Sequence, residues 1–330
     1  MLAILLCMPA CVRLHLFALT FVLGTLASAA EPPAQVRELK ITILSTMLAD
    51  GRELGEWGFA ALVEVDGRRI LFDTGAREDL VLKNTQTLRI NLSDVPEVIL
   101  SHNHWDHVGG LMRLRRSVQH ENPGALARTH VGEGIFLSRG PSDRGGDENE
   151  MIRIRPEYEA TGGEFVVHSG PVQIHPGVWL TGPVPRKHPE RNWSGSGKVL
   201  TPAGEVEDNI PEDMALVFDT TQGLVVLTGC GHAGVVNIVE HAREIVRPDR
   251  VNALFGGFHL FNASDETLAW TADKLREFGV ESFVGAHCTG LEPVYRFRRE
   301  VGLDRAHAVV GAVGATFELG KGINPRWMAR

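Results

Sequence analysis

Four side chains that can bind metal ions fall within a six-residue stretch, at His102, His104, Asp106 and His107. They follow an apolar run at 95–100 that predicts a short buried strand, so the histidines lie where that strand ends. In extended backbone, alternate side chains point the same way, which puts His102 and His104 on one side. Asp106 and His107 then open a segment at 108–116 that predicts a helix, whose N-terminus favours a carboxylate. Imidazoles suit zinc and a carboxylate adds a hard ligand, so the stretch predicts two neighbouring metal ions.

Three further segments of the sequence place a histidine after a predicted strand. They read Gly-Cys-Gly-His at 229–232, Gly-Gly-Phe-His-Leu at 256–260 and His-Cys-Thr-Gly at 287–290. A single case would suit a buried structural histidine, but three beside the central motif indicate one site. Cys230 and Cys288 could form a disulfide in an oxidising compartment. Their positions within histidine motifs favour a role in the site instead.

Asp73 begins the triplet Asp-Thr-Gly, which is also a signature of aspartic proteases. That chemistry requires two carboxylates that share a proton, so a second triplet of this kind is expected. The segment at 219–221 reads Asp-Thr-Thr and lacks the glycine. The sequence therefore disfavours an aspartic protease.

Together these motifs resemble the signature of the metallo-β-lactamase superfamily, over most of residues 38–320. They are similar to the branch named for ribofuranosylaminobenzene 5'-phosphate synthase, which includes dihydropterin-related enzymes often described as metal-dependent hydrolases. The resemblance implies an α+β fold with four layers (αββα), in which two mixed β-sheets are flanked by helices. It also implies that Asp73 supports a metal ligand through hydrogen bonds and does not bind metal itself.

The resemblance divides the ligands between two metal ions. It assigns three side chains to the first ion, His102, His104 and His232. It assigns three to the second ion, Asp106, His107 and His287. Cys230 stands where many members have a bridging Asp and some lactamases a Cys, so it is a candidate ligand of the second ion. His259 is a ligand, a residue that supports one, or a proton donor to the substrate.

These assignments predict a dinuclear hydrolase that uses two divalent metal ions. Zinc is expected, and the same ligand types also suit manganese or iron. A metal-bound hydroxide would attack a phosphoester or other small anionic ester, Asp106 would orient it, and His259 would protonate the leaving group. One alternative is a β-lactamase or lactonase of the same fold, although residues 231–234 match the lactonase segment Gly-His-Thr-x-Gly only in part. A non-hydrolytic metal-binding module is the other alternative.

The periodicity of the sequence predicts the elements that carry these motifs. Strands are predicted at 39–45, 251–255 and 281–284, and hairpins at 59–72, turning at Asp66-Gly67, and at 214–227. Helices are predicted at 77–88, 235–246 and 265–278, the last capped by Ser264. Residues 113–165 are the least regular segment. Their polar, breaker-rich part at 141–150 is either a lid or binding element, or a disordered insertion.

Residues 1–30 predict an export signal. Arg13 is the only charge before Glu31, the stretch 15–26 is apolar, and Ala27-Ser28-Ala29 offers a signal-peptidase site. A linker at 31–37, one metallo-β-lactamase-like domain at 38–320 with an irregular insertion at about 113–165, and a C-terminal tail at 321–330 follow. We expect a periplasmic or secreted protein without a stable membrane span after cleavage of the signal.

The distribution of charge bears on the partners of the protein. The formal net charge is -8 and the basic residues are scattered, which disfavours binding to nucleic acid. Arg186 and Lys187 lie in a turn-rich basic segment at 182–188. They either bind an anionic group of a small-molecule substrate or are simply solvated.

Overall fold

The computed structural model describes residue 2 and residues 34–143, 145–190, 192 and 197–327. Within these ranges, the strands form two large β-sheets and one small hairpin. The first sheet follows the order β17-β16-β1-β2-β3-β4-β5-β6. In chain order its strands are β1 (Leu39–Ser45), β2 (Ala60–Val65), β3 (Arg68–Phe72), β4 (Glu97–Leu100), β5 (Arg128–Gly132), β6 (Glu164–His168), β16 (Thr316–Glu318) and β17 (Gly322–Asn324). Neighbours from β17 to β3 pair antiparallel and those from β3 to β6 pair parallel, so the sheet is mixed.

The second sheet follows the order β15-β14-β13-β12-β11-β8-β7. In chain order its strands are β7 (Val172–His175), β8 (Val178–Leu180), β11 (Leu216–Thr220), β12 (Gly223–Thr228), β13 (Val251–Gly256), β14 (Phe283–Gly285) and β15 (Ala308–Val310). Strands β12 to β15 pair parallel and the others pair antiparallel, so this sheet is mixed as well. The small hairpin consists of β9 (Lys198–Thr201) and β10 (Gly204–Glu207).

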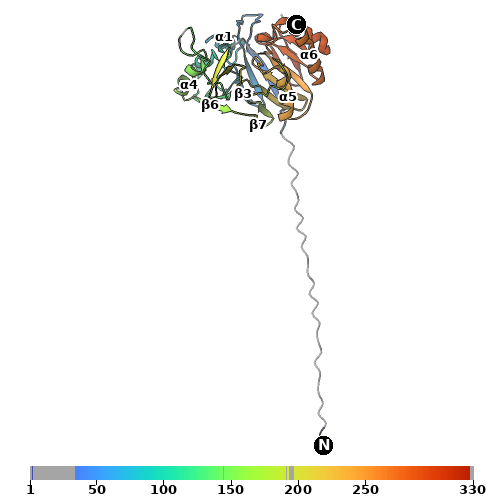
Figure 1. The fold of residues 1–330 in the computed structure, drawn as a ribbon, viewed down its shortest axis with the longest axis horizontal. Coiled ribbons are helices and arrows are strands. Elements are labelled where there is room, and N and C mark those ends of the chain that lie inside the picture. The colour runs from blue at the N-terminus through green and yellow to red at the C-terminus, as the bar shows by residue number, and fades with distance from the viewer. Residues whose placement is uncertain (1, 3–33, 144, 191, 193–196, 328–330) are drawn as a thin grey trace. The chain divides into compact units, whose positions relative to one another are not determined.

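The two sheets pack face to face, and helices cover their outer faces. Buried side chains of both sheets, such as Phe72 and Phe218, share one core between them. Three helices pack against the outer face of the first sheet, namely α1 (Leu80–Leu88), α3 (Leu111–Val118) and α4 (Met151–Glu159). Three others cover the second sheet, namely α5 (Val235–Ile245), α6 (Asp265–Glu277) and α7 (Leu291–Phe297). Figure 1 shows α4 and α6 on opposite sides of the strands. The predicted αββα fold is confirmed.

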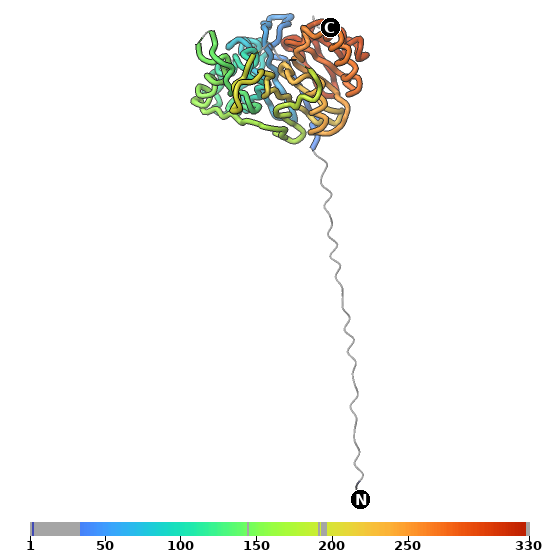
Figure 2. The backbone as a smooth tube through the Cα atoms, viewed as in Figure 1, coloured from blue at the N-terminus to red at the C-terminus, as the bar shows by residue number. Residues whose placement is uncertain are grey.

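The order of the strands along the chain largely matches their division between the two large sheets. Residues coloured teal to green in Figure 2 lie mostly on one side of the described part of the chain, and the orange-to-red residues gather on the other. The first sheet takes β1 to β6 from the first half of the chain, and only β16 and β17 join it from the end. Each half therefore supplies most of one sheet, and the face between the sheets joins segments far apart in the sequence.

Most predicted elements are present close to their expected ends. The first hairpin turns through Asp66 and Gly67, whose φ angles of 43° and 77° are both left-handed, as a tight two-residue hairpin turn requires. Helix α6 begins after Ser264, whose Oγ accepts a hydrogen bond from Thr267 N. The helix predicted at 108–116 is divided instead into α2 (Trp105–Val108) and α3, because two glycines at 109–110 interrupt it.

The segment at 113–165 is more regular than the sequence analysis predicted, and it is part of the domain core rather than an irregular insertion. It holds the end of α3, strands β5 and β6, and α4, so it completes the first sheet. Strand β5 has the sequence Arg-Thr-His-Val-Gly and is buried after its first residue. Because most of these residues are polar or glycine, the sequence does not show the apolar pattern of a buried strand. The longest loop of the segment is at 133–150, of which residue 144 lies outside the described residues.

The boundaries of the domain also differ from the expected ones. Val36, in the expected linker, is fully buried and donates its backbone N–H to Asp219 O at 2.7 Å. Strand β17 lies in the expected tail and pairs with β16. The predicted export signal at 1–30 lies outside the described residues, apart from residue 2. Among the residues described, no helix has the length and apolar character needed to cross a membrane.

Candidate functional site

The register of the second sheet brings three histidine segments to one level. Thr228 of β12 pairs with Gly256 of β13, and Gly256 pairs with Gly285 of β14. These strands run parallel, so their carboxyl ends meet at one edge of the sheet. The loops that follow carry His232, His259 and His287. Sequence motifs that are about thirty residues apart therefore begin side by side.

The first sheet brings its own strand ends to the same place. Phe72 of β3 pairs with Ile99 of β4, and Asp73 N donates a hydrogen bond to Ile99 O at 2.8 Å. The two sheets meet closely at Gly229, because a Cβ there would lie 2.0 Å from Ser101 Oγ and 2.6 Å from Asp73 Oδ2. Glycine is required at this position for the two sheets to approach each other this closely.

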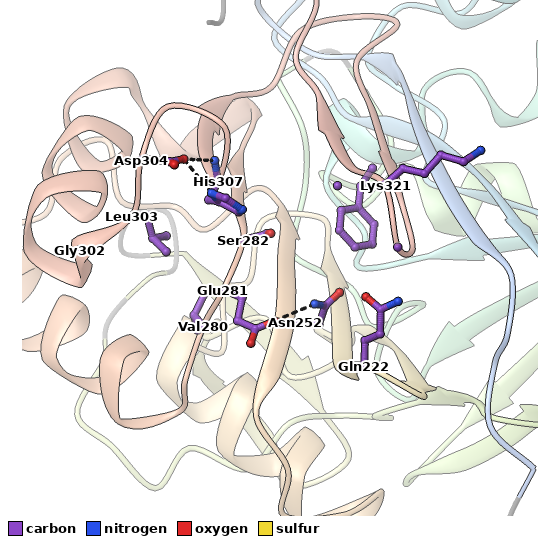
Figure 3. A pocket seen from close by; sticks show the side chains of 13 residues that line it. Gln222, Asn252, Val280, Glu281, Ser282, Gly302, Leu303, Asp304, His307 and Lys321 are labelled. Atoms are coloured by element: carbon purple, nitrogen blue, oxygen red, sulfur yellow. Dashed lines mark hydrogen bonds and ion pairs between the residues drawn. The ribbon is translucent and has the colours of Figure 1, made fainter.

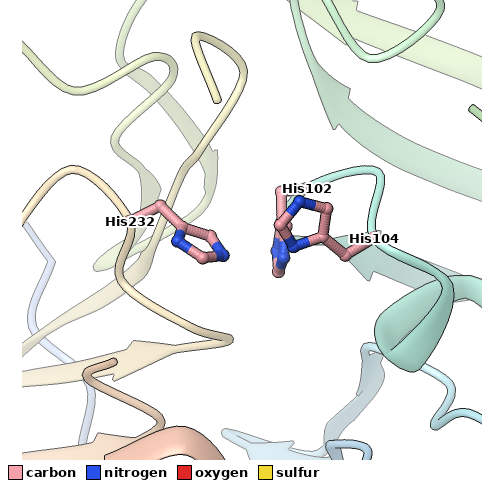
Figure 4. Close-up of side chains that lie close together, drawn as sticks. All are labelled: His102, His104 and His232. Carbon is pink, nitrogen blue, oxygen red and sulfur yellow. The ribbon is translucent and has the colours of Figure 1, made fainter. Parts of the chain in front are cut away.

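The three side chains predicted to bind the first metal ion lie together and point toward one another (Figure 4). The rings of His102 and His104 have centroids 4.6 Å apart, and the His232 ring lies 4.7 Å and 4.8 Å from them. The Nε2 atoms of His102 and His232 are buried and have no hydrogen-bond partner in the described part of the chain. A buried nitrogen without a partner is costly, and a metal ion would satisfy both. The residues present therefore fit a metal ion.

The three side chains predicted for the second ion form an adjoining group. His287 Nε2 lies 3.2 Å from Asp106 Oδ2, and His107 Nε2 lies 4.0 Å from the same oxygen. Cys230 Sγ is 3.1 Å from His107 Nε2, so the thiol borders this group as well. Because His102, His107 and Cys230 also lie within 4.8 Å of one another, the two groups are continuous.

Hydrogen bonds fix which nitrogen of two imidazoles faces the site. Asp73 Oδ2 accepts a hydrogen bond from His107 Nδ1 at 2.7 Å and another from Ser101 Oγ at 2.8 Å. The single hydroxyl proton of Ser101 is thereby used, so Ser101 Oγ accepts from His102 Nδ1 at 2.9 Å. Both imidazoles are protonated on Nδ1 and present the lone pair of Nε2. The hydrogen bond expected from Asp73 to a ligand is present, with Ser101 extending it to His102.

His232 is oriented in the same way, since its Nδ1 donates to the carbonyl oxygen of Asn192. Burial lowers the pKa of His102 and of His232 well below the ordinary value, and it lowers the pKa of His104 to about 4. These three imidazoles are therefore neutral at pH 7. Their nitrogens are available to a metal ion without loss of a proton.

The second group carries charge. Burial opposes ionisation of Asp106, but the neighbouring imidazoles of His107 and His287 lower its pKa below the ordinary value. Burial also disfavours the charged form of His287, and this is outweighed by Cys288 and Asp106, which raise its pKa to about 10. Asp106 and His287 thus carry opposite charges and lie in contact. A divalent ion would replace the proton of His287.

A pocket of about 480 Å³ opens over both groups. His104, Asp106, Cys230 and His287 line it from these two groups, and His259 lines it beside them. Its other lining residues are Trp57, Asn103, Trp105, Arg139, Glu148, Gly197, Lys198, Asp208, Phe261 and Cys288. A concave site with convergent polar groups is the expected setting for a small-molecule substrate.

Comparison with known proteins agrees with this geometry. The family model described as "Metallo-beta-lactamase superfamily" matches residues 58–200. A 7,8-dihydropterin-6-methyl-4-(beta-D-ribofuranosyl)-aminobenzene-5'-phosphate synthase from Methanocaldococcus jannaschii is 30% identical over 261 residues, which are 76% of this chain and 87% of that protein. This chain belongs to the metallo-β-lactamase superfamily. It therefore has the hydrolase-like fold of that superfamily, and the predicted resemblance is confirmed.

Solved structures of the metallo-β-lactamase superfamily match the same fold. Tm1679, described as a metal-dependent hydrolase of the beta-lactamase superfamily, has a TM-score of 0.67 and 29% identity, covering 84% of this chain and 98% of that chain. The metallo-beta-lactamase fold protein YhfI from Bacillus subtilis has a TM-score of 0.54 and 14% identity, covering 86% of this chain and all of that chain. The second likeness concerns the fold alone.

Two residues of this metallo-β-lactamase superfamily member lie elsewhere than predicted. Arg186 and Lys187 do not line the pocket. The Arg186 guanidinium donates to backbone carbonyls, including that of Ile210 at 3.0 Å, and burial lowers its pKa. Lys187 pairs with Glu244 on α5. The basic segment thus stabilises a loop and a helix rather than meeting a ligand in this pocket.

The sequence analysis missed part of the pocket wall. Arg139 donates to Asp208 Oδ2 at 2.9 Å and to both carboxylate oxygens of Glu212, at 2.9 and 2.8 Å. This buried cluster fixes the loop at 133–150, whose Glu148 also lines the pocket. In its described part, the loop is therefore an ordered part of the pocket wall. No short-range pattern links Arg139 to an acid 69 residues away.

A second, larger pocket of about 650 Å³ lies apart from these residues (Figure 3). Its polar side chains bond to one another, as Asn252 Nδ2 does to Glu281 Oε2 at 2.9 Å and His307 Nδ1 to Asp304 Oδ1 at 2.7 Å. None of the predicted site residues lines it. The smaller pocket is therefore the one that predicted site residues line.

Proposed function

We propose that this chain is an exported dinuclear metal-dependent hydrolase of a phosphoester or another small anionic ester. One observation carries the proposal. Two adjoining groups of metal-capable side chains border one pocket, and buried Nε2 atoms of the first have no partner in the described chain. Fold and family membership support hydrolysis at the level of the superfamily, whereas substrate, metal and export are our own inferences.

The proposed metal ions are zinc, held by two sets of side chains. The first set is His102, His104 and His232. The second is Asp106, His107 and His287, with Cys230 beside them as a soft donor. When bound, such ions polarise the scissile group and supply an ionised water at neutral pH.

The protein's own groups then have distinct tasks. Asp106 lines the pocket as a carboxylate. We assign it the orientation of a nucleophile, from which it would accept a hydrogen bond. His259 is half-buried, lines the same pocket and has a left-handed φ of 45°. Its Nδ1 is buried without a hydrogen-bond partner among described residues, while its ring lies 4.7 Å from that of His232. We assign it the protonation of the leaving group.

The pocket lining supports a small substrate with an anionic part and an apolar part. Lys198 supplies positive charge at the wall, in an ion pair with Glu205 at 2.6 Å. Trp57 and Phe261 pack edge to face with centroids 5.7 Å apart, and both remain about half exposed. Exposed aromatic rings beside a polar centre favour contact with the apolar part of a ligand.

The test combines metal analysis with a substrate panel. Full-length protein is purified without chelator, its zinc, manganese and iron are measured, and its turnover of nitrophenyl phosphates, nitrophenyl acetate and nitrocefin is compared. We expect about two ions per chain and turnover of a phosphate ester but not of nitrocefin. Nitrocefin turnover would favour the β-lactamase alternative, and bound metal without turnover of any ester would favour the non-hydrolytic module. The synthase name of the Methanocaldococcus relative makes the last outcome a necessary arm of the test.

The proposed export has its own measurement. We expect the mature protein to begin near Ala30 or Glu31, which the intact mass of the active protein would show. An intact Met1 on soluble, active protein would contradict export by a cleaved signal.

A further inference from the structure

Two cysteines of the site lie in contact with each other. Cys230 Sγ and Cys288 Sγ are 3.3 Å apart, and both are free thiols. They follow β12 and β14, with β13 between these strands. A Cβ at Gly257 would lie 2.2 Å from Gly229 O and 3.0 Å from Cys288 Sγ. The glycine after β13 therefore leaves the space in which the two sulfurs meet.

The distance between the sulfurs is close to that of a bond. A disulfide bond is about 2.05 Å long, so the sulfurs need to approach by only about 1.2 Å. Both cysteines line the 480 Å³ pocket, although Cys230 is only 2% exposed and Cys288 is fully buried. Of the two, only Cys230 has any exposed area, so a small oxidant that enters the pocket would meet its sulfur first. The active cysteine of another protein is too large to enter.

We propose that Cys230 and Cys288 are a modification site at which a small peroxide forms a disulfide, and that this disulfide and the second metal ion exclude each other. The first part depends only on the contact of the two thiols. The second part rests on the proposed metal centre, because it takes Cys230 as a donor to that ion.

The oxidation balances with peroxide as the only oxidant. A cysteine thiolate attacks one oxygen of hydrogen peroxide, the O–O bond breaks, and a sulfenic acid and hydroxide form. The sulfur of the other cysteine then attacks the sulfenic sulfur, the S–S bond forms and the S–O bond breaks. The leaving hydroxide takes up the thiol proton as water. Two thiols and one peroxide thus give one disulfide and two waters.

The link to metal binding follows from the position of Cys230. Its sulfur is 3.1 Å from His107 Nε2, so the thiol borders the second donor group. A sulfur in a disulfide bond has lost the thiolate charge that makes it a good metal ligand. A thiolate bound to a metal ion is, in turn, less available to attack peroxide. Because this coupling is reciprocal at equilibrium, zinc must disfavour the disulfide relative to the two thiols by the same factor by which the disulfide weakens zinc binding. The slower oxidation by peroxide is a separate, kinetic effect, since it follows from the lower availability of the metal-bound thiolate.

Mass spectrometry can test the two parts separately. Full-length protein is reduced, prepared either metal-free or loaded with zinc, and exposed to hydrogen peroxide. Remaining thiols are alkylated and the protein is digested with trypsin. A disulfide between Cys230 and Cys288 joins peptides 199–243 and 277–296, which separates it from any reaction of Cys7 or Cys11. Zinc retained after oxidation is measured in the same samples.

We expect the linked peptides in metal-free protein, and at least tenfold slower formation in zinc-loaded protein. Cys288→Ser and Cys288→Ala should give no linked peptides and should keep their zinc in peroxide. Absence of the linked peptides from metal-free wild-type protein would overturn the modification site. Equal rates with and without zinc, or loss of zinc from both variants before oxidation, would overturn the exclusion. Since neither readout involves ester turnover, a failure of the proposed hydrolase function is distinguishable from a failure of this inference.

Discussion

Replacing Asp73 with asparagine tests how the site sets the tautomers of its histidines. Asp73 is fully buried and accepts three hydrogen bonds, from Ser101 N, Ser101 Oγ and His107 Nδ1. Its φ of 55° is left-handed, a conformation that asparagine tolerates, so Asp73→Asn keeps the backbone. The asparagine oxygen can still accept from Ser101 N. The asparagine NH2 group, however, then takes the place of the carboxylate oxygen that accepted from Ser101 Oγ and His107 Nδ1. A donor would thus face two donors.

The chain of hydrogen bonds gives the size of the effect. His107 can relieve the conflict only by moving its proton to Nε2, which removes the lone pair facing the site. Ser101 is affected in the same way. In the native protein its Oγ accepts a hydrogen bond from His102 Nδ1. In the variant its Oγ would accept from the new amide and donate to His102 Nδ1, which moves the proton of His102 to Nε2. Supporting hydrogen bonds of this kind change metal affinity by about 10- to 100-fold, which corresponds to about 1.4–2.7 kcal/mol. We expect losses of this size for the second ion, through direct contact, and smaller losses for the first, through Ser101.

The assay is a zinc titration against a chelator of known affinity, resolved into two sites. Ser101→Ala dissects the effect, because it should weaken the first ion while the contact between Asp73 and His107 remains. Asp219→Asn is the matched control, since Asp219 is also a buried carboxylate but bonds to Gln35 and Arg247. Zinc affinities of Asp73→Asn that equal those of Asp219→Asn would refute the reasoning, whatever the effect of either variant on stability.

Three further outcomes are expected. His102→Ala and His287→Ala should each lose mainly one of about two copurifying ions, as metal analysis would show, because their donor groups are distinct. Tyr158→Phe should lower the free energy of unfolding by about 2 kcal/mol in denaturant titration, because the buried Tyr158 hydroxyl donates to Leu126 O. Burial, with His130 beside it, lowers the pKa of His168 to about 4, so the folded state resists its protonation. Stability should therefore fall as the pH drops from about 6.5 to 4, and less steeply in His168→Gln. An unchanged stoichiometry, free energy or slope would contradict the respective claim.

The ligand-rich loops could be predicted because the residues that make them are close in sequence. A strand followed by His-x-His-x-Asp-His specifies both the donors and their direction, and α2 and β4 place them accordingly. The ends of β12, β13 and β14 were predictable for the same reason, since each apolar run stops at a glycine-containing motif. Parallel pairing then decides that they lie at one edge, and this follows from the fold class rather than from any single residue.

The pocket wall could not be predicted, because it depends on pairs that are distant in sequence. From the sequence alone, Arg139 is expected to be a solvated charge, whereas in the structure it pairs with Asp208 and Glu212. Conversely, Arg186 reads as an anion-binding residue until backbone carbonyls surround it. Burial, rather than residue type, decides whether an arginine contacts a ligand or stabilises a loop. Burial of a single loop residue leaves no periodic pattern in the sequence.

Both donor groups draw on both sheets of the fold, and this relates the site to the stability of the protein. His102 and His104 follow a strand of the first sheet, whereas His232 follows a strand of the second. Asp106 and His287 are divided in the same way. An ion bound at either group therefore joins the two halves of the sandwich at one edge of their shared core. A ligand that binds only the folded state adds stability in proportion to the logarithm of its concentration. The proposed ions would therefore stabilise the folded protein in addition to binding the substrate.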